Sequence, residues 1–520
     1  MLCTGKQNDY FTLRQQRERF SFLTIHPFEK EGDEAMKMHE REFQQSAFDA
    51  LKNRQSTLII APTGLGKTRA ALLPFIKNLC SGGLIGTRLI YSLPLRALTK
   101  GVVEELEQLC PTLKPVVHHG DEPESEFFSE RAIVTTIDQY FTAFAGAPLS
   151  WASHLSHAAA GAVLTSYSVF DEVHLLSPQR GLPLLFAILY LRQRWGLLSC
   201  VMTATLPPSI VKFFEKFCSL EKIEATTNDI AQRDSWRKVR LQLIGRKADN
   251  SFSWDEKDPE ELAQLVKERW QNWGELDVDG PKKVIVFVNT VDRAIQVYRE
   301  LQNFCPNVIL AHSRFTKEDR KRVEECLHDY FGKRARSDEA ILITTQVAEA
   351  GLNISAPLVI TEVCPMDSLI QRAGRCQRFK PNNGKEMRGL VLVVKPKTEE
   401  GKEWHAPYLD SVRVQKNQRK ETKNVPIVQI TLVVLERQAG NNGEIKLNWE
   451  LEKQLIESAL DDAYCAFLNG SGTVNYEDVK DKPLGTAYDR LNGKKGAEEE
   501  LEQELPEMGG EEHGEEEIGE

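Results

Sequence analysis

A glycine-containing loop is the first part of the sequence whose residue types and spacing could do chemistry. It follows residues 58–60 (LII), an aliphatic run typical of a buried strand. Two glycines in this spacing let backbone N–H groups point at phosphate oxygens, and the next helix adds its positive N-terminus. Lys67 would contact the β- and γ-phosphates, and the Thr68 hydroxyl would hold Mg²⁺. The pattern predicts a nucleotide-binding loop formed by Ala61, Pro62, Thr63, Gly64, Leu65, Gly66, Lys67 and Thr68.

Two adjacent carboxylates, Asp171 and Glu172, end a second apolar run. Beside a phosphate-binding loop, Asp171 would bind Mg²⁺, directly or through water, and Glu172 would polarise the water that attacks the γ-phosphate. An isolated Asp-Glu pair is more often a helix N-terminal charge pair. The nucleotide interpretation is favoured here because the loop lies upstream and Thr203 and Thr205, in TAT, end the next strand-like run.

A third stretch, residues 371–378 (QRAGRCQR), supplies positive charge. Arg375 and Arg378 lie three residues apart, on one face if the segment is helical. Facing a bound nucleotide, they could neutralise charge that develops on the γ-phosphate, as arginine fingers do. A solvated basic helix is the alternative, and the Q-x-x-G-R-x-x-R spacing argues against it.

Apolar strand-like runs and amphipathic stretches alternate in two blocks, which predicts an α/β fold with two parallel sheets covered by helices. A run IVQITLVVL near the C-terminus is interpreted as a strand, and NWELEKQLIESALDDAYCAF as a helix. The expected division is an N-terminal extension 1–38, a first domain 39–222, a connecting segment 223–281 that holds the edge of the next domain, a second domain 282–400, an accessory region 401–495 and an acidic tail 496–520.

Bulk composition excludes several classes of protein. No apolar run is long enough to span a membrane, the first thirty residues do not read as a signal peptide, and the ten cysteines show no C-x-x-C pair, so a cytoplasmic location is expected. The net charge is −10, yet residues 498–520 hold twelve Glu and no Lys or Arg, so the rest of the chain carries +2. A glutamate-rich tail is expected to be disordered, and a nearly neutral body leaves room for a basic groove.

These motifs, in this order, resemble those of superfamily 2 helicases. Within that superfamily the sequence is similar to the CRISPR-associated helicase of type I interference systems, through YSLPLRALTKGVVEEL, HHGDEP, IVTTIDQ, FDEVHLL, TATLPP, LAHSRF, TTQVAEAGLN and LIQRAGRCQRF. The similar stretches span residues 41–380, about two thirds of the chain.

The resemblance implies tandem RecA-like domains, with ATP and Mg²⁺ in the cleft between them and single-stranded DNA across their tops. Gln44 would read adenine, Gly351 and Asn353 would lie at the nucleotide, and Ala61 is a variation common in helicase-type ATPases. His174, Thr203, Thr205 and Gln371 would couple the sites. Hydroxyls, amides and arginines suit phosphate contacts that read no bases. The residues that would contact DNA are Arg96, Thr136, Asp138, Gln139, Ser313, Arg314, Thr344 and Gln346.

Two departures from the family pattern qualify the resemblance. Asn353 occupies a position where aspartate is usual, which alters a ribose or coupling contact. Many such helicases also carry an N-terminal HD nuclease, and only about forty residues precede Gln44. The sequence therefore predicts the helicase-only form, with a separate HD-type nuclease subunit and a guide-RNA effector complex as partners. An RNA helicase and a nucleotide-switched scaffold stay open as alternatives, since no residue pattern here reads the 2′-hydroxyl.

Overall fold

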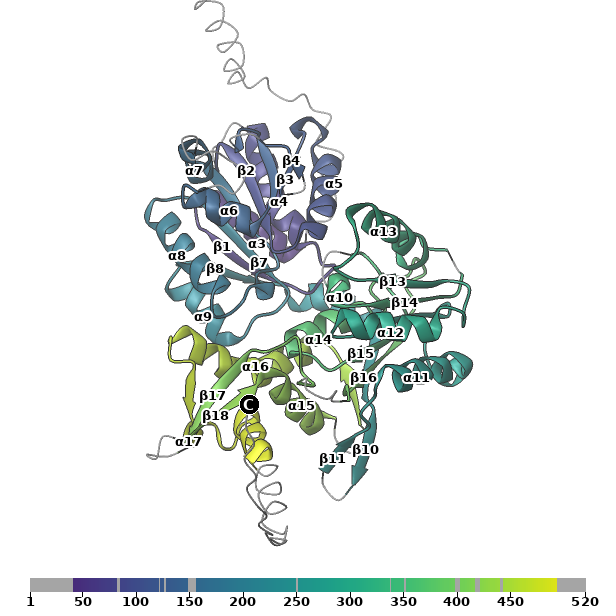
Figure 1. The fold of residues 1–520 in the computed structure, drawn as a ribbon. Coiled ribbons are helices and arrows are strands. Elements are labelled where there is room, and N and C mark those ends of the chain that lie inside the picture. The colour runs from purple at the N-terminus through teal and green to yellow at the C-terminus, as the bar shows by residue number, and fades with distance from the viewer. Residues whose placement is uncertain are drawn as a thin grey trace, which may run out of the picture. The chain divides into compact units, whose positions relative to one another are not determined.

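The computed structural model describes residues 41–81, 85–120, 122–125, 128–147, 156–248, 251–336, 338–349, 352–397, 403–416, 421–439 and 443–492 (Figure 1). The expected N-terminal extension 1–38, the acidic tail 496–520 and Gly351 lie outside these residues. The described chain divides into two compact units. The first contains the described residues up to Leu206, Val211–Trp236 and Leu352, and the second contains Pro207–Ile210, Arg237–Glu349 and the described residues from Asn353 onward.

The first unit is built on an eight-stranded sheet with the order β4-β3-β5-β2-β6-β7-β1-β8. Every described pairing in it is parallel except that of β3 with β4. The strands are β1 (Thr57–Ile60), β2 (Arg88–Leu93), β3 (Val116–His119), β4 (Glu122–Pro123), β5 (Ala132–Thr136), β6 (Ser166–Phe170), β7 (Ser199–Thr203) and β8 (Glu221–Glu224).

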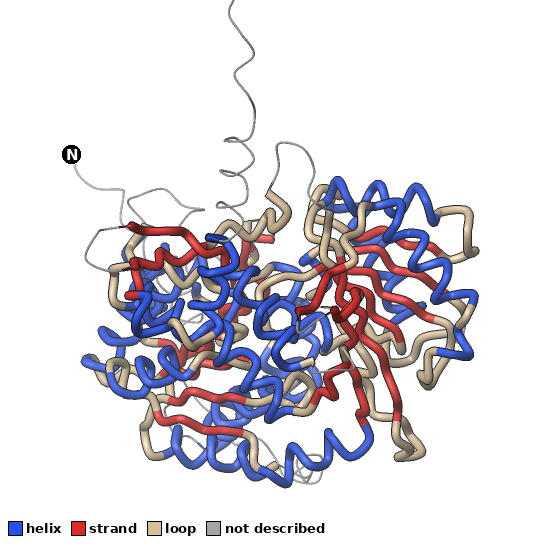
Figure 2. Tube along the Cα trace, turned by 90° about the horizontal axis from the view of Figure 1, so that it is seen from below, coloured by secondary structure: helices blue, strands red, loops and turns tan. Residues whose placement is uncertain are grey.

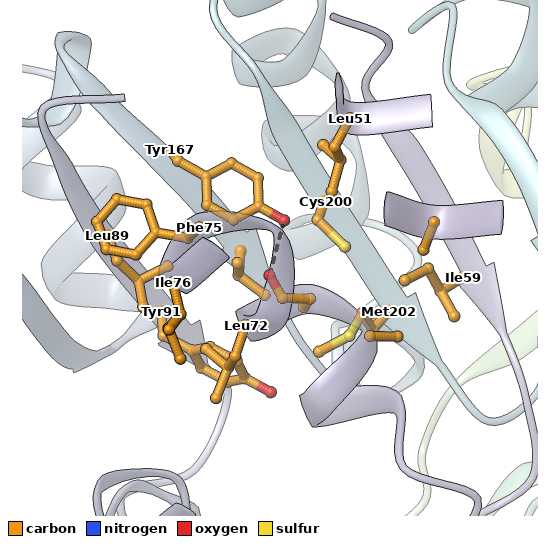
Figure 3. Close-up of a cluster of buried hydrophobic side chains, with 14 of the residues drawn as sticks. Leu51, Ile59, Leu72, Phe75, Ile76, Leu89, Tyr91, Tyr167, Cys200 and Met202 are labelled. Carbon is orange, nitrogen blue, oxygen red and sulfur yellow. Dashed lines mark hydrogen bonds between the residues drawn. The ribbon is translucent and has the colours of Figure 1, made fainter. Parts of the chain in front are cut away.

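Helices cover this sheet because successive strand residues point to opposite faces and both faces are apolar. One face packs on the helices Glu42–Lys52 and Lys67–Ser81, and Figure 3 shows Leu72, Phe75 and Ile76 of the second of these helices among strand residues such as Tyr167. The helices are α3 (Glu42–Lys52), α4 (Lys67–Ser81), α5 (Thr99–Leu109), α6 (Ile137–Phe144), α7 (Ser156–Leu164), α8 (Gly181–Arg194), α9 (Pro208–Lys216) and α10 (Thr227–Trp236).

A buried guanidinium, that of Arg192 in α8, lies at the end of this sheet opposite to the carboxyl ends of β6 and β7. Its Nη2 donates to the carbonyls of Ser166 and Leu198, both at 2.8 Å, and its Nη1 to that of Val163 at 3.0 Å. Its Nε donates to the Ser199 hydroxyl at 2.9 Å. The side chain is fully buried, so it satisfies main-chain carbonyls that water cannot reach.

The second unit contains a seven-stranded sheet with the order β13-β14-β12-β15-β16-β9-β19, in which only the β9–β19 pairing is antiparallel among those described. In Figure 2 helices flank the strands of both units. The strands of this sheet are β9 (Arg237–Leu243), β12 (Lys283–Phe287), β13 (Val308–Ala311), β14 (Ala340–Thr344), β15 (Leu358–Glu362), β16 (Met387–Val394) and β19 (Glu444–Leu447).

The rest of the second unit consists of helices and two smaller sheets. The labelled helices are α11 (Pro259–Gln271), α12 (Val291–Leu301), α13 (Lys317–Phe331), α14 (Met366–Ala373), α15 (Ile427–Gln438), α16 (Trp449–Leu468) and α17 (Tyr476–Val479), and residues 483–492 are helical as well. One small sheet is the hairpin of β10 (Gly245–Ala248) with β11 (Ser251–Trp254), and the other joins β17 (Ser411–Lys416) to β18 (Glu421–Pro426) and β20 (Thr473–Asn475).

The α/β class predicted from the alternating runs is confirmed, and so is the helix at NWELEKQLIESALDDAYCAF, which is α16. The strand predicted at IVQITLVVL is wrong, because this segment is α15. Its residues from Ile430 to Leu435 are all buried, and a helix buried on every side has the same unbroken apolar pattern as a buried strand. The patch read as loop-like, RKADNSFSWDEKDPEE, contains parts of β10 and β11 and the start of α11, which Asp258 caps by accepting from the Glu261 N–H.

Replacing Arg192 should destabilise the first unit. Arg192→Met keeps the approximate length but leaves three buried carbonyls without this donor, so we expect the free energy of unfolding to fall by at least about 2 kcal/mol. Urea titration followed by circular dichroism measures the change, with exposed Arg194→Met as the matched control on the same helix. An unchanged midpoint in Arg192→Met would contradict the assigned role.

Candidate active site

The phosphate-binding loop connects β1 to α4. β1 is buried and pairs in parallel with β7 and β8, so the loop begins at the carboxyl edge of the sheet. Gly64 and Gly66 have φ angles of +84° and +87°, in the left-handed region that favours glycine. A Cβ on Gly66 would also lie only 2.7 Å from Nε2 of Gln44. Backbone conformation therefore explains both glycines of the motif, and close packing adds a second reason at Gly66.

Lys67 is the first residue of α4, and its ammonium stays against the loop. Nζ donates to the Ala61 carbonyl at 3.0 Å, and the side chain is largely buried. The loop carbonyl thus holds a positive charge beside the N–H groups of the helix start. This combination of a cation with a helix N-terminus is suited to binding phosphate.

Oxygen ligands converge beside Lys67 at the ends of β2 and β6. The Tyr91 hydroxyl donates to Oδ2 of Asp171 at 2.6 Å and also forms a hydrogen bond with the Thr68 side chain. Oδ1 of Asp171 accepts from the Glu172 N–H at 2.8 Å. Thr68 and Asp171, predicted to hold Mg²⁺, are therefore brought together, and their hydroxyl and carboxylate oxygens fit the preference of that ion.

Burial determines the electrostatics of the acidic pair. It raises the pKa of the Asp171 carboxyl, the neighbouring Glu172 raises it further, and Lys67 opposes both effects. Burial likewise raises the pKa of the Tyr91 phenol well above its usual value, so its hydroxyl stays a donor. A buried carboxylate of this kind is stabilised by a cation beside it.

Three of the expected coupling residues form one chain of contacts. Nδ1 of His174 lies 3.2 Å from Oγ1 of Thr203 and 3.5 Å from Oε2 of Glu172. Oγ1 of Thr203 also donates to the Thr205 carbonyl at 3.0 Å. Burial lowers the pKa of His174, although Glu172 opposes the shift. The end of β7 is therefore connected to the acidic pair through the imidazole.

Gln44, expected to read adenine, lies at the start of α3 and contacts the loop. Its Nε2 donates to the Gly66 carbonyl and its Oε1 accepts from the Arg41 N–H, both at 2.9 Å. The Arg41 guanidinium donates to the Leu65 carbonyl. Arg41 also lines an open pocket of about 740 Å³, together with Glu42, Asn228, Asp229, Ala231, Gln232 and Ser235.

The arginine segment of the second unit departs from one expectation. α14 ends at Ala373, so Arg375 and Arg378 lie beyond the helix and do not share a helical face. Arg375 is buried and donates to the Glu349 carbonyl, whereas Arg378 is half-buried and its Nη2 donates to Oδ1 of Asn353 at 3.1 Å. The Asn353 side chain, a departure from the family pattern, is thus used as an acceptor for Arg378.

The first arginine of that segment, Arg372, has a different environment. It is fully buried, with Nε 2.7 Å from Oε1 of Glu349 and Nη2 donating to the Tyr408 hydroxyl at 2.8 Å. Gln371, expected to couple the sites, is also buried in α14. Both side chains lie in the interior of the unit, where Arg372 holds several loops together.

The residues expected to contact DNA divide by exposure. Arg96, Asp138, Ser313 and Arg314 are exposed, and Gln346 is half-buried, whereas Thr136, Gln139 and Thr344 are buried. Thr344 is fully buried and its hydroxyl donates to the Ala311 carbonyl at 3.0 Å, so it is a structural residue at the end of β14. Arg314 pairs with Asp292 at 2.7 Å, and Gln346 donates to the Asn289 carbonyl at 3.2 Å.

The two units repeat one local arrangement. In the first, the Thr135 hydroxyl of β5 donates to the His118 carbonyl of β3 at 2.6 Å, as the Thr344 hydroxyl of β14 does to Ala311 of β13. Each of these threonines is followed by a second one. Of these four threonines the sequence predicts DNA contacts only for Thr136 and Thr344, whereas the hydroxyls of Thr135 and Thr344 close strand ends. Sequence reasoning missed Tyr91 altogether, because a hydroxyl inside the apolar run RLIYSL carries no spacing signal.

None of the helices in the described ranges combines the length and the apolar character needed to cross a bilayer. Within the same part of the chain, no group of three or more His, Cys, Asp or Glu side chains is arranged to hold a metal ion.

Two parts of the chain match known protein families. Residues 41–213 match the DEAD/DEAH box helicase family, and residues 280–381 match the family described as CRISPR-associated nuclease/helicase Cas3, C-terminal. The CRISPR-associated nuclease/helicase Cas3 of Streptococcus thermophilus is 26% identical over 379 residues, covering 62% of this chain and 39% of that protein. The chain spans less than half the length of the first three curated relatives it matches.

Solved structures show the same fold over nearly the whole chain. The structure titled T. fusca Cas3-AMPPNP has a TM-score of 0.62 at 18% identity, covering 95% of this chain and 58% of that one. A structure titled CRISPR RNA-guided surveillance complex, pre-nicking, has a TM-score of 0.58 at 19% identity, covering 96% and 59%. The two sheets described above therefore have the fold of tandem RecA-like domains, and the two matched parts of the chain are similar to DEAD/DEAH box helicases and to the C-terminal part of Cas3.

Proposed function

We propose that this protein is an ATP-driven helicase or translocase that moves on single-stranded DNA in type I CRISPR interference, in the cytoplasm. The observation that carries the proposal is the convergence of Lys67, Thr68, Asp171 and Glu172 at the carboxyl edge of one parallel sheet. The order of its motifs and the Cas3 relatives supply the biological setting.

Each candidate site residue of the first unit has a chemical task in this proposal. Lys67 and the loop N–H groups bind the β- and γ-phosphates, and Thr68 with Asp171 would hold Mg²⁺, which when bound would withdraw charge from the phosphate oxygens. Glu172 accepts a hydrogen bond from the attacking water. Gln44 and Arg41, beside the open pocket, are the residues we assign to the nucleoside end of ATP.

The second unit supplies the remaining groups. We assign Arg375 and Arg378 to charge neutralisation at the γ-phosphate during hydrolysis. Of the two, Arg378 is the more exposed and has the better claim to a direct contact. The exposed polar residues Arg96, Asp138, Ser313 and Arg314, with Gln346, are the proposed contacts to the DNA strand, since none of them needs to read a base.

We also propose that strand cleavage is done by a separate HD-type nuclease subunit, recruited with a guide-RNA effector complex. The similar solved structure titled CRISPR RNA-guided surveillance complex, pre-nicking, supports the guide-RNA effector complex as a partner. Support for the separate nuclease subunit comes from the described histidines among residues 41–380, which are spread over strands, helices and loops of the two RecA-like units.

The decisive experiment compares ATP turnover of the purified chain with no nucleic acid, with single-stranded DNA and with single-stranded RNA of the same sequence. Stimulation by DNA well above that by RNA is the expected result. Equal or greater stimulation by RNA would support an RNA helicase, and a response to neither would support a nucleotide-switched scaffold. Each of these outcomes contradicts the proposal.

Lys67→Ala and Glu172→Gln should both abolish ATP turnover, for different reasons. Loss of Lys67 removes a phosphate contact, so nucleotide binding weakens, whereas Glu172→Gln leaves the phosphate loop intact and ATP still binds. Turnover assays and equilibrium binding of a fluorescent ATP analogue separate the two effects, with the exposed pair Lys52→Ala and Glu221→Gln as controls. Equal loss of ATP affinity in both variants would refute the assigned roles.

The purified chain should not cut single-stranded DNA with Mn²⁺, Ni²⁺, Co²⁺ or Mg²⁺, with or without ATP. A metal nuclease needs a cluster of His and carboxylate ligands fixed by surrounding groups. The assay is gel analysis of labelled DNA, and a His328→Ala variant purified in the same way separates intrinsic cleavage from that of a contaminant. Metal-dependent cleavage that co-purifies with the chain and disappears in that variant would refute the separate nuclease.

A further inference from the structure

Gln377 holds a backbone conformation that its residue type disfavours. It precedes Arg378 and has a φ angle of +48°, in the left-handed region where glycine is the usual residue. A non-glycine residue persists there when surrounding contacts compensate for the strain. The side chain at this position is therefore expected to have a specific task.

The amide of Gln377 is bound at two points. Nε2 donates to the Asp279 carbonyl at 2.6 Å and to the Arg388 carbonyl at 2.8 Å, and the residue is buried. Both of its N–H groups thus have an acceptor on another segment. One acceptor precedes β12 and the other lies at the start of β16, so the amide joins the arginine segment to the sheet.

The two segments that accept from Gln377 are joined to each other by hydrogen bonds between Asp279 and Arg388. The Arg388 N–H and Nε donate to Oδ2 of Asp279 at 2.8 and 2.9 Å, and Nη2 donates to Oδ1 at 2.8 Å. Arg388 also pairs with Asp277. These bonds from Arg388 lower the pKa of Asp279 to about 2. The Gln377 amide is therefore bound to two segments that are themselves joined by hydrogen bonds between Asp279 and Arg388.

Close packing on both sides holds the segment from Cys376 to Arg378 in place. A Cβ on Gly389 of β16 would lie 2.5 Å from Sγ of Cys376 and 2.8 Å from Cγ of Gln377, so glycine is needed for the segment to lie on the strand. On the other side the Gln377 N–H donates to the Ala356 carbonyl at 3.2 Å, and the Arg378 N–H donates to the Ser355 hydroxyl at 3.0 Å.

We propose that Gln377 is a positioning residue for Arg378: its amide fixes the backbone from which the Arg378 guanidinium reaches the nucleotide. The guanidinium end has one further support, the acceptor Oδ1 of Asn353 at 3.1 Å. The inference rests on the proposed role of Arg378 in ATP hydrolysis. Displacing a charged group by about 1 Å is enough to lower a rate about 100-fold, which gives the amide anchor a functional effect.

A double-mutant cycle with Arg378→Ala tests the proposal in the full chain. Gln377→Glu has the same shape but sets a carboxylate against two carbonyls, and Gln377→Gly removes the anchor without backbone strain. We expect either variant to lower kcat for DNA-stimulated ATP hydrolysis by about 10- to 100-fold with less than about a twofold change in nucleotide affinity. In the Arg378→Ala background, neither should lower kcat further.

The controls separate the possible failures. Exposed Gln302→Glu makes the same chemical change at the end of α12 and should leave turnover unchanged. If Arg378→Ala alone turns over ATP normally, the proposed function of that arginine fails. If Arg378→Ala is defective but Gln377→Glu and Gln377→Gly are normal, the positioning role is overturned. Equal losses in both backgrounds would show that Gln377 acts independently of Arg378, which also overturns it.

Discussion

Parallel strand pairing is the constraint on which the rest of this structure depends. β1 pairs on one side with β7 and on the other with β8, so its main-chain polar groups are used by the sheet. Both faces of such a sheet are covered by helices, so a side chain in the middle of a strand cannot reach a ligand. The residues that could bind one therefore lie at the strand ends. Because the strands run in one direction, the loop after β1, the acidic pair after β6 and Thr203 of β7 reach the same edge.

Buried guanidiniums reinforce this arrangement, in different places in the two units. Arg192 donates to carbonyls at the start of β6 and β7, far along the strands from the acidic pair. Arg372 of the second unit lies at the end of β15, where Nη1 donates to the Thr361 hydroxyl at 2.9 Å and to the Glu362 carbonyl at 3.0 Å. A guanidinium offers five donors in a rigid fork, so one side chain can satisfy several acceptors that water cannot reach.

Residue spacing predicted most of the nucleotide-binding residues of the first unit, but few of the residues that hold them in position. The loop glycines, Lys67 and the acidic pair could be recognised because each needs a defined residue type at a defined position. Tyr91 and Gln377 could not, since their partners are distant in sequence and depend on how strands and loops pack. The same limit explains α15, whose continuous apolar run fits a strand as well as a buried helix. The shared helical face considered for Arg375 and Arg378 does not form, because α14 ends at Ala373 and a three-residue spacing gives no information on where a helix ends.

The conformation of Glu172 has a consequence for how this chain can change over evolutionary time. Its φ angle is +51°, which for a residue with a Cβ costs about 1 to 2 kcal/mol relative to a relaxed backbone. Asparagine or glycine at this position would relieve that strain, so drift toward greater stability would tend to remove the acidic side chain. A copy of this gene released from the need to hydrolyse nucleotide would be expected to lose Glu172 early.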